Sequence, residues 1–326
     1  MNVLSLFSGI GAFEKALSDL NISYTLINYC ENNKHASKSY SAIHGVSESL
    51  NLWDIEKVDF KSISFDIDFL THGSPCQSFS KEGKNDGADK GSNTKSSFLW
   101  YSVEAIKILK PKYVLWENVE NVTSKKHIHN FNNYLNELQE IGYTNYHKVL
   151  NAKDFGVPQN RSRSFVVSIR NDINKTFTFP NKIPLTKTIF DFLDENVPTT
   201  YDVPSDFPCI DGYYHIRQAT KKGYIEIKDG IFDWNYPNSK TRRGRVQGNG
   251  MICPTLTATK ANLILIDNGR FRNLTAREQF KLMGFTETDY QLAKDAGVSE
   301  SQLYKQSGNS IVVDVLKAIY KNLFTS

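Results

Sequence analysis

The chain has few cysteines and no long apolar run, and both absences exclude classes of protein. Its four cysteines, Cys30, Cys76, Cys209 and Cys253, are far apart among 326 residues and form no Cys-x-x-Cys pair. This spacing argues against a zinc site and a disulfide framework, and it fits a reducing cytoplasm. No run of eighteen apolar residues occurs, and the N-terminal MNVLSLFSGIGAF lacks a basic flank, so we predict neither a membrane span nor a signal peptide.

Charge of one sign is not in large excess either. The chain carries 39 lysine and arginine residues against 35 aspartate and glutamate residues, a net charge of +4. This balance says little about partners until the distribution of the charges is known. Hydrophobic residues make up 40% of the chain and aromatic residues 12%, which predicts a globular protein with one large domain, or one large and one small domain.

The first 170 residues alternate between short β-branched runs and longer amphipathic stretches. We predict strands at Val3–Phe7, Thr25–Cys30, Asp68–His72, Tyr113–Trp116 and Phe165–Arg170. We predict helices at Gly11–Leu20, Phe98–Leu109 and Phe131–Ile141. This alternation is typical of an α/β fold in which crossover helices join the strands of a parallel sheet.

The composition changes after Pro180. Residues 180–260 contain seven of the ten prolines and no convincing long helix. Helical patterns return at Thr275–Met283 and at Ser310–Leu323. We therefore predict an α/β domain of residues 1–179, completed by residues 271–326, and a small irregular domain of residues 180–270.

A glycine-containing turn and two acids suggest a nucleoside site. The segment FSGIG, residues 7–11, joins the first predicted strand to the first helix, where glycines let a backbone pass close to a ligand. Its spacing is GxG rather than GxGxxG, so a mere tight turn is the alternative. Glu31 ends the second strand, where an acid commonly accepts hydrogen bonds from ribose hydroxyls. Asp54 could accept from an adenine amino group, or be a solvated loop residue.

Three further segments offer reactive or charged side chains. In GSPCQSFS, Cys76 follows an apolar strand and a stiffening proline, which suits a displayed nucleophile but also a plain loop cysteine. Glu117 ends an apolar strand at the same sheet edge; burial there would raise the pKa of its carboxyl and suit a proton donor, whereas a helix-capping glutamate is the alternative. In QNRSR, Arg161 and Arg163 project to one face and could clamp a carboxylate, a phosphate or a base edge, or form surface salt bridges.

The order of these segments is more specific than any one of them. FSGIG, PCQ, ENV, QNRSR, PTLTA and QSGNSI follow one another along nearly the whole chain. In this order and spacing the chain resembles the cytosine-5 DNA methyltransferase family, of the bacterial or phage restriction-modification type. The resemblance implies a Rossmann-like, S-adenosylmethionine-dependent methyltransferase domain with a small target-recognition domain at residues 180–270.

The resemblance also assigns catalytic roles. Cys76 would add to carbon 6 of cytosine, and Glu117 would hold or protonate ring nitrogen 3. Arg163 would support the carbonyl oxygen of the base and the glutamate, and Arg161 belongs to the same motif. No metal is implied.

The implied cofactor is S-adenosyl-L-methionine. Its expected binding residues are Phe7, Gly9, Gly11, Glu31, Asp54, Ile55, Pro75, Asn309 and Ile311. The family often has an aspartate where Ser5 stands, and an aromatic residue where Asn32 stands. The second departure removes an adenine-stacking partner from its usual place.

The implied substrate is double-stranded DNA, from which the target cytosine must leave the stack. Residues 81–97 are glycine-rich and polar, so they suit a loop that closes over the flipped base, with a disordered insertion as the alternative. Ser80, just before this loop, is an expected DNA contact. We expect a monomer that acts in the cytoplasm of a bacterial cell or a phage-infected host.

A basic interval identifies the expected DNA-binding face. Residues 240–272 hold seven lysines and arginines against one acid, Asp267, a local net charge of +6. This excess suits DNA phosphates, although an ordinary solvated face has the same composition. We expect Arg242, Arg243 and Arg245 to contact phosphates or guanine edges.

Three other functions are compatible with parts of the pattern. A tRNA cytosine-5 methyltransferase of the same fold would be expected to lack a variable module of roughly 80 residues. A non-catalytic DNA-binding regulator would not need Cys76, Glu117 and both arginines. A cysteine hydrolase would need a histidine partner, for which His72 is the nearest candidate.

Overall fold

The chain folds into two compact units. The computed structural model describes residues 1–75, 95–203, 209–210, 213–217, 224–233, 246, 248–258, 263–267 and 269–325. Unit 1 comprises Met1–Leu150, Ser162–Asn181 and Val315–Ser326, and unit 2 comprises Asn151–Arg161 and Lys182–Asp314.

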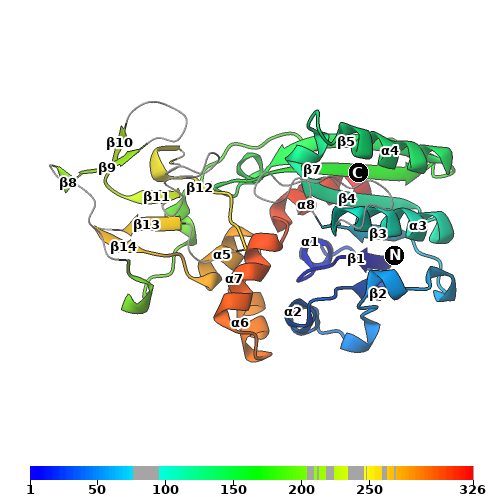
Figure 1. Cartoon of the computed structure of the whole chain (residues 1–326), viewed down its shortest axis with the longest axis horizontal. Coiled ribbons are helices and arrows are strands. Elements are labelled where there is room, and N and C mark those ends of the chain that lie inside the picture. The colour runs from blue at the N-terminus through cyan, green and yellow to red at the C-terminus, as the bar shows by residue number, and fades with distance from the viewer. Residues whose placement is uncertain are drawn as a thin grey trace. The chain divides into compact units, whose positions relative to one another are not determined.

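Unit 1 is built on one six-stranded sheet, seen in Figure 1. Its strand order is β2-β1-β3-β4-β7-β5. The strands are β1 (Asn2–Leu6), β2 (Thr25–Cys30), β3 (Phe69–His72), β4 (Tyr113–Val119), β5 (Tyr143–Asn151) and β7 (Ser162–Arg170). The first four are parallel, as predicted, and they begin and end close to the predicted positions.

The prediction of a parallel sheet is wrong at β7, which pairs with β4 in the antiparallel direction. Only residues 152–161 join β5 to β7, and a parallel crossover needs a dozen residues or more. The sequence reading also missed β5, whose residues are mostly partly exposed and carry no continuous apolar run.

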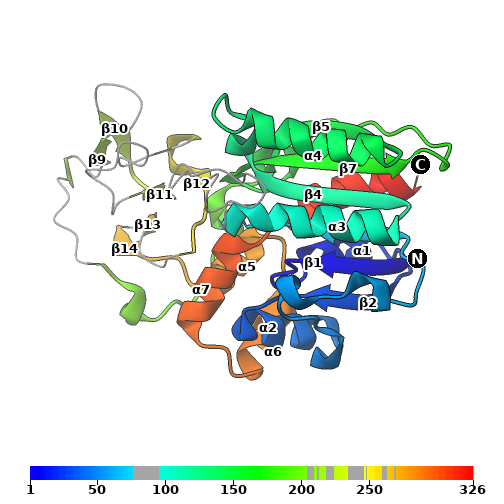
Figure 2. The same ribbon diagram turned by 45° about the vertical axis from the view of Figure 1, so that its right-hand side comes forward.

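Helices cover both faces of this sheet. They are α1 (Ala12–Asp19), α2 (Lys34–His44), α3 (Leu99–Leu109), α4 (Ile128–Glu140) and α8 (Val313–Tyr320). Alternate strand residues such as Leu4, Leu70 and Val114 share one hydrophobic cluster with residues of α3 and α4, which lie in front of the sheet in Figure 2. Phe69 points to the opposite face, where its ring meets that of Tyr320 in α8 at 5.6 Å.

Helix α2 was not predicted from the sequence because its buried residues are small or polar. They are Ala36, Ser37, Ser39 and Tyr40. Asn33 stabilises its start, since the Asn33 side chain accepts hydrogen bonds from the backbone N–H groups of residues 35 and 36. Tyr40 packs on the sheet by stacking on Tyr29 at 4.0 Å.

Unit 2 combines short sheets with three helices. Two three-stranded sheets, β10-β9-β8 and β11-β13-β14, and the two-stranded pair β12-β6 occur among its described residues. The strands are β6 (Gln159–Asn160), β8 (Cys209–Ile210), β9 (Tyr213–Arg217), β10 (Tyr224–Ile227), β11 (Gly230–Asp233), β12 (Cys253–Pro254), β13 (Leu263–Asp267) and β14 (Arg270–Arg272). The helices are α5 (Ala276–Leu282), α6 (Glu287–Asp295) and α7 (Glu300–Asn309). The sequence reading grouped these helices with the α/β domain, whereas in the structure they share unit 2 with residues 182–275.

Candidate active site at the carboxyl ends of the strands

The carboxyl ends of β1 to β4 bring together most of the predicted site residues of unit 1. The chain passes from β1 to β2 on one side and then crosses to β3 on the other side of β1, so strand order reverses there. Ligands of open α/β sheets bind in the crevice beyond the strand ends at such a reversal. Gly9 follows β1, Glu31 follows β2, Pro75 follows β3, and Glu117 lies near the end of β4.

The loop after β1 has three residues with positive φ, a conformation that glycine adopts most easily. Phe7, Gly9 and Gly11 have φ values of 55°, 57° and 80°. A side chain at Gly11 would also collide with His44, because a Cβ placed at Gly11 would lie 2.0 Å from the His44 Nε2 atom. At Gly9 the same Cβ would meet nothing within 4 Å, so the loop leaves open space on that side.

Glu31 is fixed beside this loop by hydrogen bonds from two backbone N–H groups. Its carboxylate accepts the Gly9 N–H at 3.0 Å and the Asn33 N–H at 2.7 Å. Asp54 lies nearby in the chain fold, because the Asn51 side chain bonds both the Glu31 and the Trp53 backbone. This arrangement fits the ribose and base of a nucleoside.

Glu117 and Arg163 form an ion pair on one face of the sheet. Arg163 lies opposite Val119 in the β4–β7 register, which puts it on the same face as Glu117. The Arg163 Nε atom is 3.1 Å from Glu117 Oε1, and the side chains are only 17% and 11% exposed. Burial disfavours a charged carboxylate, while the guanidinium favours it, so the two effects oppose each other at this acid.

Arg161 has a different environment, and the prediction that it shares a clamp with Arg163 is wrong. Its side chain is buried. It donates hydrogen bonds to the backbone carbonyls of Leu256, Gly308 and Ser310, at 2.9, 3.0 and 2.6 Å. Arg161 therefore braces backbone within unit 2.

These bonds join the last two sequence motifs, PTLTA and QSGNSI. Gly308 makes their close approach possible, because a Cβ there would lie 2.2 Å from the Thr257 carbonyl. Of the two predicted cofactor residues in this part, Asn309 is exposed and Ile311 is buried.

Two residues of β4 donate hydrogen bonds to Ser74, which lies two residues before Cys76. The sequence reading missed both. The Trp116 indole N–H donates to Ser74 Oγ at 3.1 Å. The Asn118 amide donates to the Ser74 carbonyl, also at 3.1 Å. All three residues are buried. The signal that could have found them is a polar Asn and a Trp in an otherwise apolar strand.

His72 belongs to the core rather than to a reactive site. Its ring stacks on Trp116, and its Nε2 atom is 3.0 Å from the Tyr134 hydroxyl. Burial lowers the pKa of His72 to about 3, so the imidazole stays neutral. These contacts disfavour a cysteine hydrolase that uses His72 as its base.

Several predicted residues lie outside the described residues. They are Cys76, Ser80, residues 81–94 of the predicted closing loop, and Arg242, Arg243 and Arg245.

Two arginines of the basic interval are committed to internal contacts. Arg272, 1% exposed, makes a two-pronged ion pair with Glu278 at 2.8 and 2.9 Å. Arg270 bonds Asp202 and the carbonyls of residues 197 and 198. The local charge of +6 therefore overstates what this interval can offer to DNA, because Arg272 is buried against Glu278 and Arg270 already has an acidic partner.

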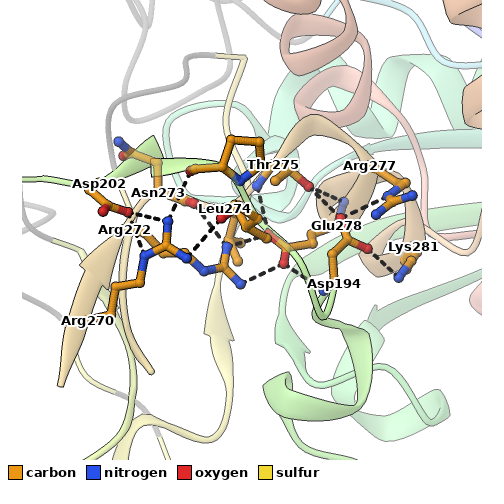
Figure 3. A network of polar contacts seen from close by, with 12 residues as sticks. Asp194, Asp202, Arg270, Arg272, Asn273, Leu274, Thr275, Arg277, Glu278 and Lys281 are labelled. Atoms are coloured by element: carbon orange, nitrogen blue, oxygen red, sulfur yellow. Dashed lines mark hydrogen bonds and ion pairs between the residues drawn. The ribbon is translucent and has the colours of Figure 1, made fainter. Parts of the chain in front are cut away.

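Figure 3 shows that this ion pair belongs to a larger network at the start of α5. Glu278 also accepts the backbone N–H groups of Thr275 and Asp194. The Asp194 carboxylate in turn bonds Thr275, Arg277 and Lys281. Burial opposes ionisation of Asp194, but the bonds from Lys281 and Arg277 hold its pKa below the ordinary value.

The acids, histidines and thiols of the described residues are the side chains that could bind a metal ion. Within the described part of the chain, no group of three or more His, Cys, Asp or Glu side chains could hold a metal ion. Cys30 is buried, and burial raises the pKa of its thiol to about 12, which leaves it unreactive.

Among the helices of the described ranges, none is long and apolar enough to cross a membrane.

Comparison with known proteins identifies this arrangement. Residues 1–325 match the family described as C-5 cytosine-specific DNA methylase. The chain belongs to this family. It is 40% identical over 282 residues to the type II methyltransferase M2.ScrFI of Lactococcus lactis subsp. cremoris, which covers 85% of this chain and 71% of that protein. It is 31% identical over 334 residues to the type II methyltransferase M.HhaI of Haemophilus parahaemolyticus, covering 100% of this chain and 95% of that protein.

Solved structures agree on the fold. The crystal structure of the S. pombe Dnmt2 methyltransferase superposes with a TM-score of 0.70 at 21% identity, covering 100% of this chain and 98% of that one. The Entamoeba histolytica methyltransferase EhMeth gives a TM-score of 0.69 at 21% identity, with the same coverage. The Rossmann-like α/β fold and the cytosine-5 DNA methyltransferase family predicted from the motif order are thus confirmed, and the protein is a DNA cytosine-5 methyltransferase.

Proposed function

We propose that the protein transfers a methyl group from S-adenosyl-L-methionine to carbon 5 of a flipped-out cytosine within a specific double-stranded DNA sequence. The observation that carries the proposal is the buried Glu117–Arg163 pair on β4 and β7. The pair would supply an acid and a cation to one polar ring. Its acid lies on β4, the strand whose Trp116 and Asn118 side chains hydrogen-bond Ser74, two residues before Cys76.

The residues at the ends of β1 and β2 fit the proposed cofactor. Glu31 follows β2, where an acid commonly binds ribose hydroxyls, and the space at Gly9 admits a ligand close to the backbone. By family resemblance, Phe7, Gly11, Asp54, Ile55, Pro75, Asn309 and Ile311 complete the binding set. When bound, S-adenosyl-L-methionine supplies an electrophilic methyl group, which suits attack by an electron-rich carbon.

The chain's own residues would make carbon 5 electron-rich. We assign Cys76 as the nucleophile: its thiolate forms a bond to carbon 6, and the ring electrons move to carbon 5. Glu117 holds or protonates nitrogen 3, so that the addition does not leave a full negative charge on the ring. Arg163 holds Glu117 and supports the carbonyl oxygen of the base. After methylation, carbon 5 loses its proton to solvent, and the electron pair of that bond expels the thiolate by β-elimination.

We reassign Arg161 from catalysis to positioning. Its guanidinium bonds the carbonyls on either side of Asn309, one of the proposed cofactor residues. Its effect on the reaction would therefore pass through the backbone of the QSGNSI motif.

We further propose that residues 180–270 recognise the DNA sequence. Ser80, Arg242, Arg243 and Arg245 would contact DNA, and residues 81–97 would close over the flipped base. The protein would act as a monomer, without a metal, in the cytoplasm of a bacterial cell or phage-infected host, where its DNA substrate lies. Restriction-modification is the setting of the type II relatives and is proposed for this chain as well.

The experiment is covalent trapping on DNA that carries 5-fluorocytosine at the target position. Fluorine cannot leave as the carbon 5 proton does, so wild-type protein should form an adduct that survives denaturation. Cys76→Ser should form none while still binding the cofactor, because an alcohol is far less ionised than a thiol. An equally abundant adduct with the serine variant would contradict the assignment. Methyl incorporation into tRNA but not DNA would favour the tRNA enzyme of the same fold.

A further inference from the structure

Trp53 has a backbone conformation that is unusual for a large aromatic residue. Among the described residues, five that are not glycine have a positive φ: Phe7, Asn21, Trp53, Lys110 and Asn249. Asparagine tolerates this region, but a bulky side chain there is an outlier that persists only where the surroundings enforce it. The two aromatic residues of the set are Phe7, in the loop after β1, and Trp53, whose φ is 60°.

The groups that enforce this conformation also fix Glu31. Asn51 Oδ1 accepts the Trp53 N–H at 2.8 Å and the Glu31 N–H at 3.1 Å, while Asn51 Nδ2 donates to the Glu31 carbonyl at 2.9 Å. The Cys30 thiol donates to the Trp53 carbonyl at 3.2 Å. The backbone N–H and C=O of Trp53 are thus bound by the side chains of Asn51 and of Cys30, the last residue of β2. Because Asn51 also binds the Glu31 backbone, the position of Trp53 is tied to that of Glu31.

Trp53 is only partly buried. Trp53 is 41% exposed, whereas Leu52 packs against the core and Ile55 is buried. A strained backbone costs stability, and the part of the apolar ring that stays in solvent adds no burial to offset that cost. Asn32, which follows Glu31 directly, is exposed and not aromatic.

We propose that Trp53 stacks on the adenine ring of S-adenosyl-L-methionine. This inference rests on the proposed function and adds one binding residue to it. In the sequence, Trp53 stands between Asn51, whose side chain fixes the backbone of the ribose-binding acid, and Asp54, the proposed partner of the adenine amino group. Stacking of an aromatic side chain on a base is a strong, sequence-tolerant contact, and an indole offers the largest ring surface of any side chain.

Three substitutions separate the ring from the backbone. Binding of S-adenosyl-L-homocysteine is measured by calorimetry, and thermal unfolding is measured without ligand. Trp53→Phe should keep most of the affinity. Trp53→Ala and Trp53→Gly should both weaken binding by about 10- to 100-fold, since both lose the ring. The glycine variant should nevertheless unfold at a higher temperature than the alanine variant, because glycine adopts φ near +60° without strain.

Fluorescence gives a readout that does not depend on turnover. Stacking should quench the emission of Trp53, so ligand-induced quenching in the wild type should be largely lost in Trp53→Phe although that variant still binds. Phe65→Ala, which removes another exposed aromatic ring of unit 1, should leave affinity unchanged. Lys110→Gly, at another residue with a positive φ, should affect stability only.

Two outcomes would overturn the inference. One is wild-type affinity in the alanine and glycine variants. The other is loss of affinity that follows loss of thermal stability across the three variants, which would make Trp53 structural. Failure of the wild-type protein to bind the ligand at all would instead contradict the proposed function.

Discussion

Replacing Glu117, which pairs with Arg163, by glutamine tests the catalytic role of its carboxyl. Glu117→Gln keeps the shape of the side chain but removes the acid, so turnover should fall about 100-fold or more while DNA affinity changes little. Glu120→Gln, just beyond β4 with an exposed side chain, is the matched control and should keep wild-type turnover. Rates of methyl incorporation and thermal melting are the measurements. A collapse of melting temperature together with activity would show that Glu117 is structural.

Glu14, which the sequence reading did not single out, should make stability depend on pH. It is fully buried in α1, and burial raises the pKa of its carboxyl from the ordinary 4.5 to about 7. Between these values the folded state holds a proton that the unfolded state releases, so stability falls as pH rises through the window. Above pH 7 the ionisation of Glu14 lowers the free energy of unfolding by about 3 kcal/mol. His72 acts in the opposite sense: its pKa falls from 6.5 to about 3 on folding, so the unfolded state takes up a proton that the folded state does not, and this contribution to stability rises with pH up to about 6.5.

Glu14→Gln removes this ionisation. The variant should gain stability over the wild type at pH 8 and gain little at pH 5, as measured by urea unfolding at both values. Glu120→Gln, with its exposed carboxyl, should show no such difference. An equal effect of Glu14→Gln at the two pH values would refute the explanation.

At the start of α5, one buried ion pair organises several chain segments. Removing one partner of a buried pair leaves an uncompensated charge, so Glu278→Ala should destabilise the protein by about 3–5 kcal/mol. Glu287→Ala removes an acid that is 66% exposed and pairs with Arg277, so it should cost less than about 1 kcal/mol. Urea unfolding of the two variants tests the contrast, and similar losses would contradict it.

The elements were predictable where local pattern and tertiary packing agree. Strands β1 to β3 are short apolar runs that end in loops, and each was found within a residue or two. Helix α2 was missed because most of its buried residues are small or polar, and strand β5 was missed because most of its residues are partly or fully exposed. The direction of β7 was missed because β5 was missed, so the short connection of residues 152–161 was not recognised as one that reverses the chain.

The distribution of charge over the whole molecule governs DNA binding. Arg242, Arg243 and Arg245 are expected to divide between phosphates and guanine edges. An arginine that contacts a phosphate, changed to alanine, should weaken binding to all DNA and reduce the salt slope by about one unit. One that reads a base should cost about 1–3 kcal/mol on the target site and relax the methylated sequence.

Salt-dependent binding and methylation mapping of the three variants distinguish these outcomes. Arg270→Ala is the matched control, because Arg270 already pairs with Asp202. If none of the three variants changes salt dependence or sequence preference, the recognition surface lies elsewhere in residues 180–270.

The sequence by itself determined the family, because the order and spacing of its motifs are properties of the chain. It also located Glu31, Glu117 and Arg163, since each lies at the end of a strand whose apolar pattern is local. Those positions needed no knowledge of distant partners.

Only the tertiary structure decided what the other arginines do. Arg161 and Arg163 are two residues apart and look equivalent in QNRSR, yet Arg161 bonds a carbonyl 147 residues away. Arg272 looks like a DNA contact until Glu278 is seen to bury it. A guanidinium can serve a phosphate, a carboxylate or a carbonyl equally well, so its role depends on which acceptor the fold brings to it. The left-handed backbone of Trp53 is held in part by Asn51, two residues away, and in part by Cys30, 23 residues away on β2, a contact that no local pattern encodes.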